Sequence, residues 1–140
     1  MLVKPITPKI GVEISDVPLA ELNKSQLQQI RELFIQHMVL VFRDQHLSRD
    51  EHKSFARHFG DLHIHPSKQN SFGSLKVGDD PEVFIIDTKP EARQSNGEAW
   101  HSDVSCEEIP PLASLLYVTK TPENDGGDTM FANMHEIYEA

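Results

Sequence analysis

A continuous apolar run, Met38-Val39-Leu40-Val41-Phe42, most constrains the fold of this chain. The residues are β-prone and no polar residue alternates with them, which predicts a buried strand. The preceding segment opens with Asn23 followed by Gln26, the pattern of a helix capping box. Apolar residues then recur at helical spacing until about His37: Leu27, Ile30, Leu33 and Phe34. The front of the chain is therefore predicted to hold a helix with one buried face, followed by a buried strand.

Two further helices and one further strand are predicted around this pair. Residues 9–14 alternate apolar and polar side chains and indicate a short strand. Ser48 and Glu51 repeat the capping-box signal and open a helix that ends at Gly60. Its apolar face consists of Phe55, Ala56 and Phe59. Asn133, with Glu136 three residues on, would cap a last helix.

The second half of the sequence carries shorter strand patterns at irregular intervals. They lie in residues 82–87, 99–104, 113–118 and 128–131, and residues 63–80 are predicted to form a long loop. With helices at the front, this order favours an α+β fold, the N-terminal part of a jelly roll with helices packed outside the sheet. The chain has 140 residues, enough for one small domain. Because the last helix is cut after about two turns, we expect residues 1–140 to form a single, incomplete domain.

Composition excludes several classes of partner. A net charge of −9 argues against nucleic acid and an anionic membrane surface. The single cysteine, Cys106, excludes an internal disulfide and a cysteine-based zinc cluster, and it fits a reducing compartment. No secretory signal or membrane-length apolar run is present. The predicted localisation is cytoplasmic.

The stretch Ala99-Trp100-His101-Ser102-Asp103-Val104 places an imidazole and a carboxylate two residues apart. On a strand both would point to one face, which gives two of the three ligands of a non-haem iron facial triad. The alternative is a solvated strand face, or a histidine oriented by a nearby carboxylate. Trp100 would pack behind the pair and hold the strand.

Several motifs occur in the order seen in taurine dioxygenase-like enzymes, which this chain resembles. They are FRDQ (42–45), FARHFGDLHIHP (55–66), IIDT (85–88), WHSDV (100–104), PPLASLL (110–116) and GGDTMFANM (126–134). The resemblance implies an Fe(II)- and 2-oxoglutarate-dependent dioxygenase with a double-stranded β-helix core.

The resemblance also implies site residues. His101 and Asp103 resemble the first two iron ligands, and Thr129 resembles the threonine that binds the 2-oxoglutarate carboxylate. His65 resembles a residue that lines the substrate pocket. Lys68 stands where taurine dioxygenase has a tyrosine. As a cation at the pocket mouth it would suit an anionic substrate, and the alternative is an exposed loop lysine.

The expected reaction couples oxidative decarboxylation of 2-oxoglutarate to hydroxylation, by O2, of a small anionic molecule: a sulfonate, sulfate ester or carboxylate. Gly97 replaces an asparagine of the taurine pocket, so taurine is disfavoured. The family takes its distal iron histidine and its 2-oxoglutarate arginine from farther downstream. His135 is a poor candidate for that histidine, and we expect these 140 residues to bind iron weakly or not at all.

Two other interpretations remain open. A non-catalytic jelly-roll module that binds a metal or small ligand would keep His101 and Asp103 without a co-substrate. An inactive truncated remnant would expose apolar strand edges. Each of these interpretations is compatible with a homo-oligomer. If their segment is extended, His63 and His65 would share a face and could form a metal pair; the preferred alternative is that one lines a pocket while the other is solvated or packs locally. Glu107 with Glu108 is predicted to be a solvated pair.

Overall fold

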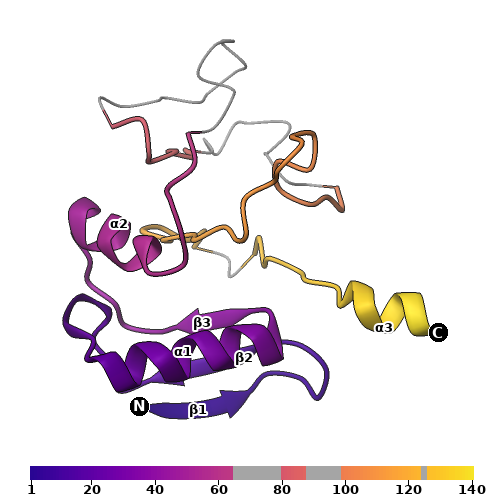
Figure 1. Ribbon diagram of the computed structural model, residues 1–140, viewed down its shortest axis with the longest axis horizontal. Helices are drawn as coiled ribbons and strands as arrows, with labels where there is room; N and C mark the ends of the chain where they lie inside the picture. Colours follow the sequence, from indigo (N-terminus) through magenta and orange to yellow (C-terminus); the bar gives the residue numbers. More distant parts are fainter. Residues whose placement is uncertain (65–79, 88–98, 124–125) are drawn as a thin grey trace. The chain divides into compact units, whose positions relative to one another are not determined.

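A computed structural model of the chain describes residues 1–64, 80–87, 99–123 and 126–140 (Figure 1). These residues belong to two compact units. The first contains Met1–His52 and Tyr117–Ala140, and the second contains Lys53–Leu116. No described helix is long and apolar enough to cross a membrane.

The first unit is built on a three-stranded sheet in the order β1-β2-β3 (Figure 1). β1 (Leu2–Pro5) runs antiparallel to β2 (Val12–Ser15), and β2 runs parallel to β3 (Leu40–Phe42). Parallel neighbours need a crossover, which here is the 3-10 helix η1 (Leu19–Glu21) followed by α1 (Lys24–His37). The result is an α+β arrangement, as predicted.

The core of this unit lies along one face of β2. Val12 and Ile14 are fully buried and Val17 is nearly so. Partly buried side chains pack against them: Met1, Leu22, Leu33, Leu40 and Phe42. On α1, Ile30 has no exposed surface whereas Ile35 is 81% exposed. The predicted one-sided burial of this helix is therefore confirmed.

All three predicted helix caps are formed. In α1, the Asn23 side chain accepts from the Gln26 amide at 2.9 Å, and the Gln26 side chain accepts from the Asn23 amide at 3.0 Å. Ser48 and Glu51 make the same reciprocal pair at the start of α2 (Arg49–Arg57). In α2, Phe55 is buried and its ring meets Phe59 edge-on at 5.5 Å.

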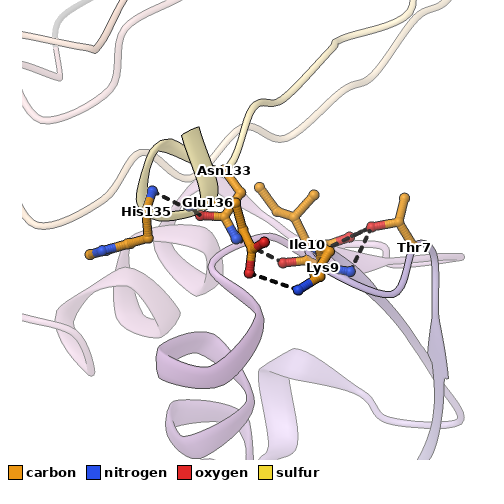
Figure 2. A network of polar contacts seen from close by, with 6 residues as sticks. All are labelled: Thr7, Lys9, Ile10, Asn133, His135 and Glu136. Carbon is orange, nitrogen blue, oxygen red and sulfur yellow. Dashed lines mark hydrogen bonds and ion pairs between the residues drawn. The ribbon is translucent and has the colours of Figure 1, made fainter. Parts of the chain in front are cut away.

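The last helix, α3 (Met134–Glu139), contacts the turn between β1 and β2. Asn133 caps α3 by accepting from the amides of His135 and Glu136, and its Nδ2 donates to the Lys9 carbonyl oxygen at 2.9 Å. Lys9 Nζ lies 3.0 Å from Glu136 Oε1. Figure 2 shows how these contacts join both ends of the chain.

In the second unit, three ion pairs connect Lys53 and Arg57 of α2 to Asp80 and Glu82. Lys53 Nζ lies 2.6 Å from Asp80 Oδ2, with both side chains less than one-fifth exposed. Arg57 Nη2 lies 2.8 Å from Glu82 Oε2.

The predicted strands of the second half are wrong for the residues that the structure describes. Within 82–87, 99–104, 113–118 and 128–131, only Ile85 has any strand pairing, an isolated bridge. A strand needs a neighbour for its backbone hydrogen bonds. The described parts of these segments, Ile85 apart, have no such neighbour. The jelly-roll architecture stays a prediction.

The front strands also differ from expectation in detail. The predicted strand at 9–14 begins later, as β2, because residues 7–10 form a turn in which Thr7 Oγ1 accepts from the Ile10 amide. Gly11 follows at φ 85°, where a side chain would be strained. β1 was not predicted, because its four residues, LVKP, do not alternate between apolar and polar and end in a proline. All four are exposed in the structure.

Candidate metal centre

His101 and Asp103 lie side by side in the second unit. His101 Nε2 is 3.2 Å from Asp103 Oδ1, and each side chain is about half exposed. The two residues predicted as metal ligands are thus brought together, with one nitrogen and one carboxylate oxygen facing each other.

The outward atoms of both side chains have partners of their own. His101 Nδ1 lies 2.8 Å from the Ala99 carbonyl oxygen. Because a carbonyl only accepts, Nδ1 carries the proton and, in the neutral ring, Nε2 carries the free lone pair. On the other side, Ser114 Oγ donates to Asp103 Oδ2. The atoms left available are the two that face each other.

These contacts favour the protonated form of the histidine. The pKa of His101 is raised, chiefly because the Ala99 carbonyl accepts from its ring, and further because of the Asp103 carboxylate; desolvation opposes both. In the imidazolium form, Nε2–H points at Asp103 Oδ1. A metal ion at this place would have to displace that proton.

The donor set fits iron(II). Imidazole nitrogen and carboxylate oxygen are the ligands of the facial triad. Adjacent ligands about 2.1 Å from an octahedral ion lie about 3.0 Å apart, close to the observed spacing. Ligand histidines commonly donate their second ring nitrogen to a backbone carbonyl, as His101 does to Ala99. The described residues contain no group of three or more His, Cys, Asp or Glu side chains that could hold a metal.

The predicted strand at 99–104 is wrong, because residues 100–102 have no regular structure and a turn begins at Asp103. Residues 103–106 form the turn, and Val104 has φ 51°, a value that no strand residue adopts. Such a conformation costs a β-branched residue about 1 to 3 kcal/mol. His101 lies just before this turn and Asp103 is its first residue, so the two residues are not on a paired strand. Trp100, expected to pack behind the pair, is 68% exposed.

The other predicted site residues belong to the first unit or lie outside the described residues. Thr129 is exposed and belongs to the first unit, so its role toward 2-oxoglutarate stays a prediction. His65 and Lys68 lie outside the described residues, as does Gly97.

Two polar contacts near the pair were not anticipated. His63 Nε2 lies 3.1 Å from Glu107 Oε2, so the prediction that Glu107 is simply solvated is wrong. Ser114 was not singled out either. Side chains along 111–116 alternate between half-buried and exposed, with Ser114 on the exposed side. A hydroxyl among the apolar residues of PPLASLL was the available signal.

Residues 2–140 match the protein family described as taurine catabolism dioxygenase TauD, TfdA family. The chain belongs to this family. An alpha-ketoglutarate-dependent sulfonate dioxygenase of Saccharomyces cerevisiae is 34% identical to this TauD-family chain over 148 residues, covering 98% of the chain and 34% of the relative. The alkylsulfatase of Acinetobacter baylyi is 36% identical over 136 residues, covering 96% and 40%.

A solved structure is also similar to the TauD-family chain. It is a Burkholderia xenovorans protein assigned as an alpha-ketoglutarate-dependent taurine dioxygenase, with a TM-score of 0.57 and 33% identity. The match covers 75% of this chain and 36% of that one. The chain spans about a third to a half of the length of its curated relatives, from 34% to 52%.

Proposed function

We propose that this TauD-family chain supplies His101 and Asp103 as two iron(II) ligands of a 2-oxoglutarate-dependent dioxygenase. One observation carries the proposal: His101 Nε2 and Asp103 Oδ1 approach to 3.2 Å while their outward atoms are held by Ala99 and Ser114. A solvated surface pair does not need both outward partners. A metal site does, because they fix the tautomer and the free oxygen.

Bound iron(II), together with 2-oxoglutarate, would supply the oxygen chemistry, in which decarboxylation of the co-substrate accompanies hydroxylation of the substrate. The protein residues hold and orient the reactants. In this proposal, His101 and Asp103 fix the metal, and Thr129 hydrogen-bonds a 2-oxoglutarate carboxylate. His65 and Lys68 line the substrate pocket.

We propose a small anionic molecule as the substrate. Relatives of this chain are named for sulfonates, sulfate esters and 2,4-dichlorophenoxyacetate, all of which carry a negative group. The chain itself has a net charge of −9, so an anion needs a local cation. Lys68 is the proposed cation.

The first test is turnover of 2-oxoglutarate by the complete protein with iron(II). His101→Ala and Asp103→Ala should each reduce it to the uncatalysed background, because a metal site that lacks a ligand loses geometry and affinity. His135→Ala is the matched control, since it removes an exposed histidine of α3, and it should turn over normally. Normal turnover in either ligand variant would contradict the assignment.

The substrate class is tested by adding candidates to the same assay. An alkyl sulfonate, an alkyl sulfate and an aryloxyacetate should be compared with an uncharged alcohol of equal length. At least one anion should stimulate 2-oxoglutarate consumption, and Lys68→Ala should raise its KM. Stimulation by the neutral alcohol alone would rule out the anionic class.

A further inference from the structure

The Ser114 contact that supports the proposed function also bears on how Asp103 would bind a metal. The Ser114 hydroxyl donates to Asp103 Oδ2, while Asp103 Oδ1 faces His101. The two oxygens of one carboxylate are therefore divided between two tasks. Carboxylates can bind a metal through one oxygen or through both.

The backbone that carries Ser114 suits this task. Pro110 and Pro111 precede it and fix two φ angles, which favours an extended chain. From residue 111 to residue 116 the side chains alternate between half-buried and exposed, so Ser114 shares a face with Leu112 and Leu116. Those two apolar side chains are 72% and 68% exposed and cannot donate to a carboxylate.

We propose that Ser114 is a positioning residue for Asp103, and this inference rests on the proposed function. By holding Oδ2, the hydroxyl keeps Asp103 a one-oxygen ligand through Oδ1. A six-coordinate ion with three single-atom protein ligands keeps three positions open, as a facial triad requires. If Asp103 bound through both oxygens, one of these positions would be lost.

The test measures coordination instead of activity. Mn(II), which accepts the same nitrogen and oxygen ligands, is added at saturating concentration to the complete protein, and water-proton relaxation per bound ion is measured. Ser114→Ala should lower this relaxation by about a third, because the released Oδ2 replaces one of three waters. Ser114→Thr retains the hydroxyl and should match the wild type.

Matched variants separate a lost hydroxyl from a lost fold. Ser114→Val has the shape of the Thr variant but lacks its hydroxyl, so it should lower the relaxation as Ser114→Ala does. If the Ala variant does not fold, the comparison of the Val and Thr variants tests the role of the hydroxyl. Ser105→Ala removes an exposed hydroxyl of the turn that contains Asp103; this hydroxyl has no hydrogen bond to another residue that the structure describes, and its removal should leave relaxation unchanged.

Failure of this inference and failure of the proposed function give different results. If His101→Ala and Asp103→Ala abolish Mn(II) binding while Ser114→Ala and Ser114→Val relax water like the wild type, the positioning role is wrong and the metal site stands. If the two ligand variants bind Mn(II) as tightly as the wild type, the proposed function itself fails.

Discussion

The Tyr117 hydroxyl donates to the carbonyl oxygen of Gln45 at 3.1 Å, across 72 positions of sequence. The Tyr117 hydroxyl oxygen also accepts from the Leu47 amide at 3.1 Å, and the Tyr117 ring lies tilted against His52 at 5.7 Å. One side chain thus satisfies two backbone groups of the loop between β3 and α2. It connects the two chain segments that make up the first unit.

Removing that hydroxyl should destabilise the first unit. Tyr117→Phe leaves a half-buried N–H and carbonyl without their partner, so we expect the free energy of unfolding to fall by about 1 to 3 kcal/mol. Urea titration followed by circular dichroism measures the change. Tyr138→Phe is the matched control, because Tyr138 is 92% exposed, and it should change stability little. Equal effects of both variants would contradict the bridging role.

The buried face of α1 can be tested with two isoleucines of the same helix. Ile30→Ala should cost about 2 to 5 kcal/mol, because Ile30 has no exposed surface and its removal leaves a cavity. Ile35→Ala should stay within about 0.5 kcal/mol, because that side chain is 81% exposed. Denaturation midpoints of the two variants give the comparison. A reversed order would mean that α1 is rotated about its axis.

The two functions of Asn133 can be separated by substitution. Asn133→Ala removes both the cap of α3 and the donation to the Lys9 carbonyl, and should cost about 0.5 to 2 kcal/mol. Asn133→Asp keeps the capping oxygen but has no donor for Lys9. Amide hydrogen exchange of Glu136 and Ile137 should therefore accelerate strongly in the Ala variant and less in the Asp variant. Wild-type exchange rates in the Ala variant would show that the cap does not hold α3.

The start of α2 should depend on pH through Glu51. Donation from the Ser48 hydroxyl and then from the Ser48 amide lowers the pKa of Glu51. Because the folded state has the lower pKa, the carboxylate stabilises α2 above the ordinary glutamate pKa of about 4.3, and this is lost as pH falls through the lowered value.

The comparison of wild type with Glu51→Gln measures that dependence. The amide retains an acceptor for the cap but does not titrate in this range, so the difference in denaturant midpoint should be constant near neutral pH and shrink in acid. Glu139→Gln, at the exposed end of α3, provides the control and should show a smaller change. A difference that is the same at neutral and acid pH would contradict the role of Glu51.

The sequence alone determined those elements whose stabilising contacts are local. α1 and α2 were predictable because a helix makes its hydrogen bonds within its own segment. Their caps, Asn23 with Gln26 and Ser48 with Glu51, lie three residues apart. The apolar run before Arg43 likewise predicted β3. The pairing of His101 with Asp103 was predicted from spacing, although the backbone there is not a strand.

Only the tertiary structure decided the contacts between distant segments. β1 exists because Leu2–Pro5 finds β2 as a partner, and its own residues give no sign of it. The later strand patterns lack such a partner among the described residues, so alternation by itself did not make strands. Ser114 meets Asp103 across 11 positions, and Lys9 meets Glu136 across 127. Strand ladders and long-range polar pairs depend on how the chain folds back, which local propensity does not encode.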